Sequence, residues 1–431
     1  MFAAINFASA EDIREYQEER LRAQIQYLSM HSPFYQTLFA KHDILPASIQ
    51  TLADLKSIPT TSKNDLQQYN DDFFCVPKSE IIDYSTTSGT LGSPVTFGLT
   101  ELDLERLAAN EVRTFEMAGV VKGDLVQLMT TMDRRFMAGM AYFLGLRKLG
   151  AGIIRVGAGV PQLQWDSIQK FKPKFLIAVP SFLLKMIEFA ENNGIDYKNS
   201  SVKTIICIGE SLRKPDLSNS LLTQRILDKW EVNLHSTYAS TEMSTAFSEC
   251  QAFAGGHQQS DLIITELLDD AGNEVPTGAV GELVVTTLGI EGLPLLRFRT
   301  GDMMRRFDAP CTCGRNSLRL GPVEGRKQHL IKYKGTTVYP PAMHDLLASF
   351  DKIQLHLIEL TSSSIGTDEI TIKIAVNQSS EQFLQDLKDQ FRAKLRVTPK
   401  IVVLPLEVLA PIIHNPLSRK PINFVDLRVE N

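Results

Sequence analysis

Apolar and polar positions show two different patterns along the chain. Between about residues 125 and 230, strand-like apolar runs such as DLVQLMT, FLIAVP and TIICIG are each followed by a helical stretch. This alternation predicts βαβ units and a mainly parallel sheet. From about residue 260, short alternating strands separated by turn signals, as in DLIITEL and GELVVTTL, predict a β-rich subdomain. Amphipathic helices are expected at 11–30 and 101–118.

The pattern resets after GRKQH. The runs HLIKYKG, PPAMHDLLASF, QLHLIEL, EITIKIAV, SEQFLQDLKDQFRAKL and KIVVLPL predict strand, helix, strand, strand, helix and strand. Such a set forms a small α+β domain that can fold on its own. We therefore expect an α/β protein with a large N-terminal domain at 1–327, built from several subdomains with mainly parallel sheets plus the β-rich part. A hinge near 326–329 would lead to the small C-terminal domain at 328–431.

Composition and charge narrow the function classes. The chain has 431 residues, 43% of them hydrophobic, which is enough for a large core and more than one domain. With a net charge of -5, no basic balance points to nucleic acid or an acidic membrane surface as a partner. The N-terminus becomes charged at once, and no run approaches the roughly eighteen apolar residues of a membrane helix. We expect a cytoplasmic protein without nucleic-acid or membrane partners. The sequence leaves open whether the protein forms a homodimer.

The run YSTTSGTLGSP at residues 84–94 carries the first candidate chemistry. Gly89 and Gly92 make backbone N–H groups approachable, and the hydroxyls add donors, so the run can hold an anion without a fixed cation. It matches neither GxxxxGK[ST] nor GxGxxG. On these residues alone, a hydroxyl-rich surface turn is the alternative. The hydroxyls expected to act as donors are those of Thr86, Thr87, Ser88 and Thr90.

The five cysteines argue against a disulfide framework, because their number is odd and low for this length. Cys207 lies in the apolar run TIICIG and is expected to be a buried small hydrophobe. The stretches CQAFAGGH and CTCG supply three thiols and an imidazole, which suit tetrahedral Zn²⁺ in a structural role. Buried thiols with a surface histidine are the alternative. The four residues are Cys250, His257, Cys311 and Cys313.

An ordered set of motifs resembles the adenylate-forming enzymes. After the loop at 84–94 come YASTE (238–242), RFRTGD (297–302), GRKQHLIKYKGTTVYP (325–340) and a lysine near the C-terminus. The stretches LRAQIQYLSMHSPFYQTLFAKHDI, LADLKSIPTTSKNDL and CTCGRNSLRLGPVEGR are similar to the phenylacetate-CoA ligase branch. The resemblance covers nearly the whole chain, with the motifs in the family's order.

This resemblance implies an activity as well as a fold. It implies an ATP-dependent, AMP-forming acid:CoA ligase that acts on an aryl or arylacetic acid through an acyl-adenylate. Its cofactors and partners would be ATP, Mg²⁺, coenzyme A and the acid, with structural Zn²⁺, because members of this branch often carry a cysteine–histidine metal site. The small domain would be mobile. The alternatives are an adenylating enzyme that passes the acyl group to a carrier protein or an amine, and a degenerate, non-catalytic nucleotide-binding homologue.

The resemblance also assigns roles residue by residue. The loop Thr86 to Gly92 would hold the β- and γ-phosphates of ATP, and Glu242 would ligate Mg²⁺. Lys420 would stabilise the charge that develops at the α-phosphate. Tyr238 would pack on adenine, and Asp302 would accept hydrogen bonds from ribose. The other predicted nucleotide-binding residues are Gly209, Glu210, Ser211, Ala239, Ser240, Thr241 and Arg326.

The acid is expected to bind against TTMDRRFMAGMAYF (130–143) and the residues before YASTE. An aromatic ring there could stack on an aryl acid, and an arginine could pair with a second carboxylate, so the acid stays open. Two positions depart from the family pattern: Ser93 stands where lysine is usual, and Gln328 where the hinge usually has aspartate. The predicted acyl-pocket residues are Arg134, Phe136, His235 and Ser236.

Overall fold

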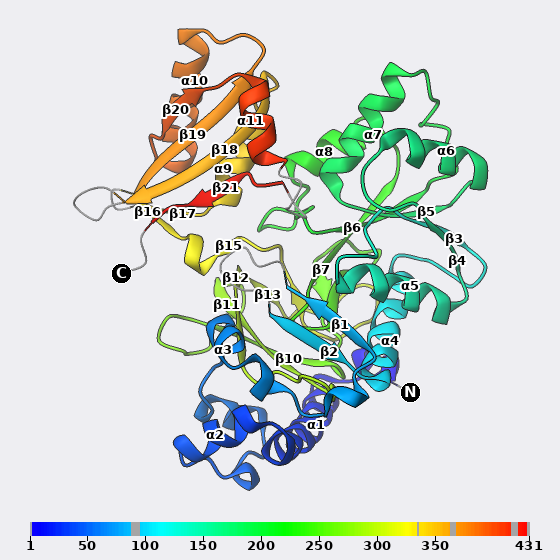
Figure 1. Ribbon diagram of the computed structural model, residues 1–431, viewed down its shortest axis with the longest axis vertical. Coiled ribbons are helices and arrows are strands. Elements are labelled where there is room, and N and C mark those ends of the chain that lie inside the picture. Colours follow the sequence, from blue (N-terminus) through cyan, green and yellow to red (C-terminus); the bar gives the residue numbers. More distant parts are fainter. Residues whose placement is uncertain (1, 88–94, 334–335, 363–367, 415–420, 429–431) are drawn as a thin grey trace. The chain divides into compact units, whose positions relative to one another are not determined.

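The computed structural model describes residues 2–87, 95–333, 336–362, 368–414 and 421–428 (Figure 1). The chain divides into two compact units, which are described separately. The first contains Met1–Thr300 and Met304–Pro322, and the second contains Gly301–Met303 and Val323–Asn431. The predicted domain boundary between residues 327 and 328 stays a prediction. The predicted α/β class is confirmed by the helices and sheets below.

The first unit is built on a nine-stranded sheet with the order β13-β14-β9-β8-β7-β6-β5-β3-β4. The strands from β7 to β4 run parallel, and those from β7 to β13 pair antiparallel. The bounds are β3 Leu125–Leu128, β4 Gly152–Arg155, β5 Phe175–Ala178, β6 Thr204–Ile208, β7 Asn233–Ser240, β8 Thr245–Glu249, β9 Gly256–His257, β13 Arg306–Phe307 and β14 Arg319–Leu320. The parallel half confirms the predicted βαβ units.

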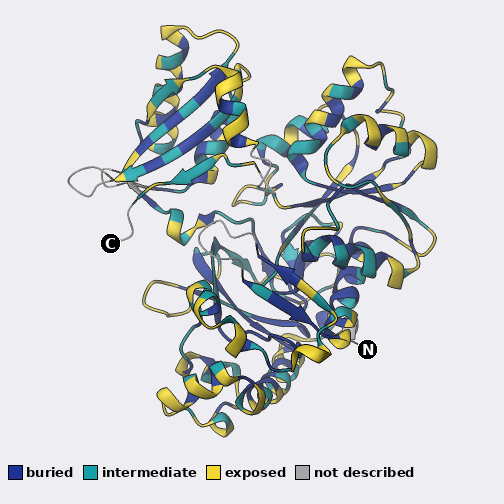
Figure 2. Ribbon diagram, in the orientation of Figure 1, coloured by how far each residue is buried: buried dark blue, intermediate teal, exposed yellow. Residues whose placement is uncertain are grey.

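Helices cover both faces of the parallel part of the sheet. Because successive side chains of a strand point to opposite faces, each buried strand contributes to two cores. In β5, Phe175 and Ile177 pack in the core formed with α4 and α5, whereas Leu176 and Ala178 pack in the core formed with α6, α7 and α8. All four residues of β5 are buried (Figure 2). The helices are α4 Glu101–Met117, α5 Met137–Leu149, α6 Pro161–Phe171, α7 Pro180–Asn192 and α8 Leu221–Leu227.

Two smaller sheets and an N-terminal helical region are the remaining elements before residue 330; β15 and residues 301–303 of β12 belong to the second unit. The antiparallel pair β1 (Asp83–Thr86) and β2 (Thr96–Leu99) flanks the run at 88–94, which lies outside the described residues. A four-stranded sheet has the order β10-β11-β12-β15, with bounds β10 Ile263–Leu268, β11 Gly281–Thr287, β12 Phe298–Met304 and β15 Gly325–Arg326. The N-terminal helices are α1 Ala10–His31, α2 Pro33–Lys41 and α3 Lys63–Gln68. Short 3-10 helices occupy Phe2–Phe7, Pro46–Ser48, Leu52–Ser57, Asn70–Phe73, Lys78–Glu80 and Lys327–His329.

The second unit contains a hairpin and a four-stranded sheet with the order β20-β19-β18-β21. Its core is formed by the apolar faces of β18, β19, α9 and α10, with residues such as Ile358, Ile372, Leu347 and Leu387 fully buried. The bounds are β16 Ile331–Tyr333, β17 Thr336–Val338, α9 Pro340–Ala348, β18 Ile353–Ser362, β19 Asp368–Val376, α10 Glu381–Leu395, β20 Lys400–Val403, α11 Leu406–Ile413 and β21 Phe424–Asp426. The strand β17, the helix α11 and the strand β21 are absent from the predicted order.

Candidate active site

The base of the predicted phosphate loop is held on both sides. Of its residues, the structure describes Thr86 and Thr87, both buried, while Ser88, Gly89, Thr90, Gly92 and Ser93 lie outside the described residues. The backbone N–H of Thr86 donates to the carbonyl of Arg135 at 3.0 Å, and that of Thr87 donates to the carbonyl of Val95 at 3.0 Å. The Thr87 hydroxyl accepts from the Val95 N–H at 3.2 Å. Thr86 is therefore tied to the segment before α5, and Thr87 pairs with Val95, which follows the run at 88–94.

The segment before α5, predicted to line the acyl pocket, contacts this loop. Arg134 and Arg135 both have φ of 57°, a left-handed conformation that costs free energy in a non-glycine residue. This conformation directs the Arg135 carbonyl to Thr86. A glycine is required at position 139, because a Cβ on Gly139 would lie 2.0 Å from the carbonyl oxygen of Thr131. Arg134 is exposed and Phe136 is half-buried.

The YASTE segment ends β7 and turns into β8. Tyr238, Ala239 and Ser240 lie on the strand, and Thr241 and the half-buried Glu242 lie in the turn. Three hydrogen bonds close the turn: Ser244 N–H to the Ser240 carbonyl at 3.3 Å, Met243 N–H to the Ser240 hydroxyl at 3.4 Å, and the Ser244 hydroxyl to the Thr241 carbonyl at 3.2 Å.

The same turn contacts the start of α5. The Ser244 Oγ lies 3.7 Å from the Met137 Sδ. Since Thr86 bonds to Arg135, residues 135–137 contact both the phosphate-loop base and the turn that carries Glu242. The structure thus brings together three segments for which the sequence predicts phosphate, acid and metal binding.

The two predicted acyl-pocket residues on β7 face opposite sides of the sheet. Because strand side chains alternate, Ser236 shares a face with Tyr238 and His235 does not. The His235 ring is buried against Phe253, with ring centroids 4.8 Å apart, and burial lowers its pKa. The backbone N–H of Ser236 donates to the Glu249 carboxylate at 3.0 Å. Ser236 is therefore the member of this pair that can share a pocket with the Tyr238 ring.

In the turn after β6, one of the three predicted nucleotide-binding residues, Glu210, has a structural role. The Glu210 carboxylate accepts from the backbone N–H of Ser181 at 2.8 Å and from its hydroxyl at 2.7 Å. It therefore satisfies donors at the start of α7, where backbone N–H groups lack helical partners. Gly209, with φ of 77°, and Ser211 are exposed. Gly209 and Ser211 are therefore the residues of this turn that a ligand can reach.

Asp302 and Arg326 are neighbours in the second unit. They are directly paired across β12 and β15, and the Arg326 Nε lies 3.2 Å from the Asp302 Oδ1. The nearby Gln328 carbonyl accepts from the Arg428 guanidinium at 2.7 Å, and the Leu330 carbonyl accepts at 2.9 Å. Sequence reasoning missed Arg428, because only the fold shows that it reaches the predicted hinge. Lys420 lies outside the described residues.

The four predicted zinc ligands form one cluster in the first unit. Their ligand atoms all lie within 4.8 Å of one another. The Sγ atoms of Cys250 and Cys311 are 3.6 Å apart, and the Cys313 Sγ is 3.5 Å from the His257 Nε2. Bonds of about 2.3 Å to sulfur and 2.0–2.1 Å to nitrogen place tetrahedral ligand atoms about 3.6–3.8 Å apart, so the residues fit zinc.

The environment of His257 agrees with a ligand role. Burial, with Arg315 and Arg319 nearby, lowers its pKa to about 4, so the imidazole is neutral, the form that binds metals. Its Nδ1 lies 3.3 Å from the Ser317 hydroxyl, which orients the ring with Nε2 toward the thiol. His257 is also fully buried, so the alternative of a surface histidine is wrong.

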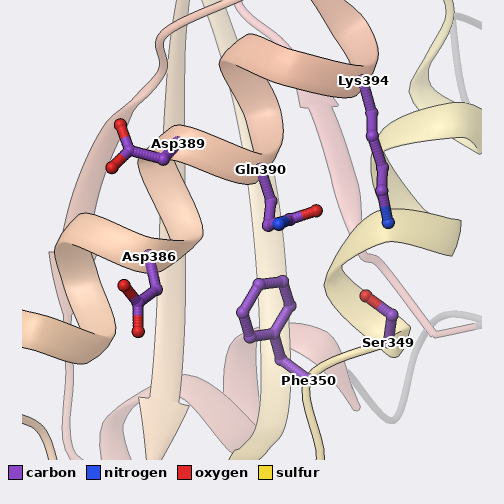
Figure 3. Close-up of a pocket in the computed structure, with 6 residues that line it drawn as sticks. All are labelled: Ser349, Phe350, Asp386, Asp389, Gln390 and Lys394. Atoms are coloured by element: carbon purple, nitrogen blue, oxygen red, sulfur yellow. The ribbon is translucent and has the colours of Figure 1, made fainter.

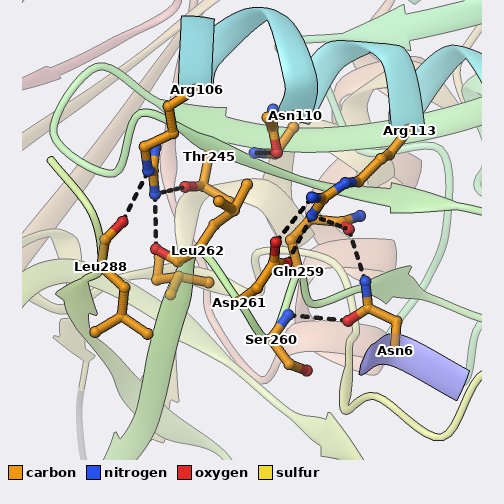
Figure 4. A network of polar contacts seen from close by, with 12 residues as sticks. Asn6, Arg106, Asn110, Arg113, Thr245, Gln259, Ser260, Asp261, Leu262 and Leu288 are labelled. Carbon is orange, nitrogen blue, oxygen red and sulfur yellow. Dashed lines mark hydrogen bonds and ion pairs between the residues drawn. The ribbon is translucent and has the colours of Figure 1, made fainter. Parts of the chain in front are cut away.

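Sequence reasoning also missed a buried polar side of α4. Five polar residues of this side recur at helical spacing and are at most 9% exposed. Figure 4 labels Arg106, Asn110 and Arg113 among them. The five residues are Asp103, Arg106, Asn110, Arg113 and Thr114. Their recurrence every three or four residues was the available signal, but exposed polar faces of helices show the same spacing.

A separate hollow of about 510 Å³ lies in the second unit, between the end of α9 and α10 (Figure 3). In Figure 3 the side chains of Gln390 and Lys394 point toward Phe350 and Ser349. The Asp386 and Asp389 carboxylates accept from glutamines of the same helix. These two acidic groups do not suit a triphosphate, so we do not place nucleotide here.

The fold and the match to a family model place the chain among the adenylate-forming enzymes. In a solved structure, 2-hydroxyisobutyryl-CoA ligase in the postadenylation state has a TM-score of 0.84 and 24% identity, covering 98% of this chain and 91% of that one. Residues 18–290 match the AMP-binding enzyme family, and the chain belongs to this family.

Curated relatives narrow the branch. The phenylacetate-coenzyme A ligase of Thermus thermophilus is 29% identical over 382 residues, which are 88% of this chain and 84% of the relative. The enzyme of the same name from Escherichia coli is 25% identical over 405 residues, covering 93% of this chain and 90% of the relative. These comparisons confirm the predicted resemblance and fold, and they support an AMP-forming acyl-CoA ligase. Within the described residues, no helix has both the length and the apolarity to span a bilayer.

Proposed function

We propose that the protein is an ATP-dependent acid:CoA ligase whose acid is aryl or arylacetic. The observation that carries this proposal is the contact of residues 135–137 with both the phosphate-loop base and the turn of Glu242. An adenylating enzyme must hold phosphates, acid and metal at one point, because the carboxylate attacks a phosphorus atom of the bound nucleotide. The relatives named phenylacetate-coenzyme A ligase support the acid class.

The reaction has two half-reactions. A carboxylate oxygen of the acid first attacks the α-phosphorus of ATP, forming the acyl–phosphate bond and breaking the bond to pyrophosphate. The thiolate of coenzyme A then attacks the acyl carbonyl carbon, forming the thioester and releasing AMP. Positioning and electrostatic stabilisation carry both steps, without a covalent enzyme intermediate.

Each predicted residue except Glu210, whose carboxylate binds Ser181, has a task in this scheme. The loop Thr86 to Gly92 would hold the β- and γ-phosphates, and Lys420 would stabilise charge at the α-phosphate. Tyr238 would pack on adenine, and Asp302 would accept from ribose hydroxyls, with Arg326 reaching ribose or phosphate. Glu242 would ligate Mg²⁺, which when bound neutralises charge on the phosphate oxygens. The remaining backbone contacts would come from Gly209, Ser211, Ala239, Ser240 and Thr241.

The acyl pocket would be lined by Phe136, Arg134 and Ser236, with His235 behind the strand. A half-buried Phe136 ring offers a face for an aryl group. The cytoplasmic location and the homodimer left open above stay predictions from the sequence.

The test of this function is acid-dependent ATP–pyrophosphate exchange with a panel of aryl, arylacetic, fatty and dicarboxylic acids. We expect exchange with aryl or arylacetic acids, lowered about a hundredfold or more in Lys420→Ala. AMP release that requires coenzyme A would then identify the acceptor. Acid-dependent exchange without such AMP release would favour a carrier protein or an amine. ATP binding without exchange for any acid would favour the non-catalytic alternative.

Zinc in the Cys250, His257, Cys311 and Cys313 cluster would have a structural role, since four protein ligands leave no open position. It would join the segment after β8 to the loop before β14. We expect the purified protein to contain about one zinc per chain.

Cys250→Ser is expected to remove the zinc and to lower the melting temperature, because metal binding contributes directly to folding free energy. Metal analysis of the folded protein and thermal unfolding measure both effects. Cys75→Ala, which changes a buried thiol outside the cluster, is the matched control and should keep the zinc. If the wild type contains no zinc and has the same melting temperature as Cys250→Ser, the zinc proposal is wrong and the cluster is a group of buried thiols beside a histidine.

A further inference from the structure

Arg106 makes an unusual set of contacts for a buried cation. It lies on α4, is 9% exposed, and donates to four acceptors. Figure 4 labels Leu288, Leu262 and Thr245 among them. The four acceptors are the carbonyls of Leu288 at 2.8 Å, Ser244 at 2.7 Å and Leu262 at 2.6 Å, and the Thr245 hydroxyl at 3.0 Å. In the part of the chain that the structure describes, no ion pair includes Arg106, and its hydrogen-bond acceptors are neutral oxygens. The carboxylates of Asp103 and Asp261 act on its charge from a greater distance.

These acceptors come from three separate segments. Ser244 and Thr245 end the turn that carries Glu242 and begin β8, Leu262 precedes β10, and Leu288 follows β11. A planar guanidinium has five N–H donors in fixed directions, so it can hold three segments at once, whereas an ammonium group is a single point. Arg106 therefore joins the Glu242 turn of the nine-stranded sheet to two strands of another sheet.

The arginine seven residues further along α4 makes a different contact. Arg113 is 8% exposed and pairs with the Asp261 carboxylate through two hydrogen bonds of 2.6 and 2.8 Å. It also reaches Gln259 at 3.3 Å, and Gln259 in turn accepts from Asn6. Figure 4 shows both arginines extending from the same helix toward the strands below it. Arg113 thus anchors residues 259–261, and its hydrogen bonds within the described residues do not include the turn of Glu242.

We propose that Arg106 is a positioning residue for the metal–nucleotide complex: by holding the carbonyl of Ser244 and the hydroxyl of Thr245, it sets where Glu242 is presented. The turn needs such an anchor because Ser244 has φ of 45°, a left-handed conformation that a serine rarely adopts without restraint. Asn110, one helical turn after Arg106, supports the same strand by accepting from the Ala246 N–H at 3.2 Å. This inference rests on the proposed function, since it assumes that Glu242 ligates the Mg²⁺ of Mg·ATP.

The experiment compares Arg106→Met, Arg106→Lys and the control Arg113→Lys. Calorimetry measures ATP affinity with and without added Mg²⁺, and the ratio reports how far the metal tightens nucleotide binding. We expect Arg106→Met to reduce this ratio about tenfold or more, as loss of a ligand-orienting residue does in metal sites. Arg106→Lys should lie between, and Arg113→Lys should keep the ratio even where it lowers the melting temperature.

Hydrogen exchange of the peptide covering 238–248 gives a second, independent readout. In Arg106→Met its amides should exchange faster, while Arg113→Lys should affect the peptide covering 257–262 instead. Unchanged exchange at 238–248, or faster exchange with an unchanged Mg²⁺ ratio, would overturn the proposal. If the wild type binds no ATP, the proposed function fails, and faster exchange confined to 238–248 would still support the anchoring of the turn. If Arg106→Met does not fold, Arg106→Lys decides by the same two measurements.

Discussion

Replacing Glu242 with glutamine is expected to lower acid-dependent ATP–pyrophosphate exchange about a hundredfold, the usual scale for losing one electrostatic group in an active site. The amide keeps the size of the side chain but removes the charge that a hard cation prefers in its ligands. The fold should be unaffected, because the hydrogen bonds that close the turn use Ser240, Thr241 and Ser244. The measurement is exchange as a function of Mg²⁺ concentration, together with the melting temperature.

A glutamate elsewhere in the same unit gives the matched control. Glu188 on α7 is exposed, so Glu188→Gln removes the same charge away from the turn and should keep full exchange. Exchange in Glu242→Gln within threefold of the wild type at every Mg²⁺ concentration would show that Glu242 is not the metal ligand. The inference about Arg106 would then lose its basis as well.

The apolar pattern predicted the parallel half of the fold because buried strands and amphipathic helices differ in period. The runs DLVQLMT, FLIAVP and TIICIG became β3, β5 and β6, and the helix expected at 101–118 became α4. In the second unit the same reasoning found α9 and α10 but missed α11. This helix contains Pro411 and follows Pro405, which are signals for breaks, yet Leu409 and Ile413 bury against Leu357 and Ala375. Packing there outweighs local propensity.

The candidate site was predicted unevenly for a related reason. Motifs with fixed local spacing, such as YASTE and the cysteine–histidine set, can be recognised in the sequence. Contacts between distant segments cannot: nothing local connects Thr86 with Arg135, or Arg106 with Ser244. A buried arginine and an exposed one look alike in sequence, because burial depends on which carbonyls the fold brings within reach.

Glu111 on α4 gives the largest expected effect on stability. It is 3% exposed, and burial raises the pKa of its carboxyl from 4.5 to about 8, although the Asn110 amide donates to it at 3.0 Å. The helix α5 approaches closely here, since a Cβ on Gly145 would lie 2.4 Å from the Glu111 Cβ. The second oxygen, Oε2, has no hydrogen-bond partner among the described residues. The folded protein therefore keeps this carboxyl protonated at neutral pH.

The direction of the pH dependence follows from this raised pKa. Below about pH 4.5 the carboxyl is protonated in both states and contributes no pH dependence. Between about pH 4.5 and 8 the unfolded chain loses the proton and the folded chain keeps it, so the free energy of unfolding decreases as pH rises. Above about pH 8 both states are ionised and the loss is complete, at roughly 3–5 kcal/mol.

Glu111→Gln should remove this pH-dependent loss, because the amide is neutral at every pH and nearly the same size. Denaturant unfolding at pH 5 and pH 8 measures it: the variant should gain roughly 3–5 kcal/mol over the wild type at pH 8 and much less at pH 5. Glu116→Gln changes an exposed glutamate of the same helix and should leave the wild-type difference intact. Equal gains at both pH values would mean that Glu111 is already ionised in the folded protein at pH 5.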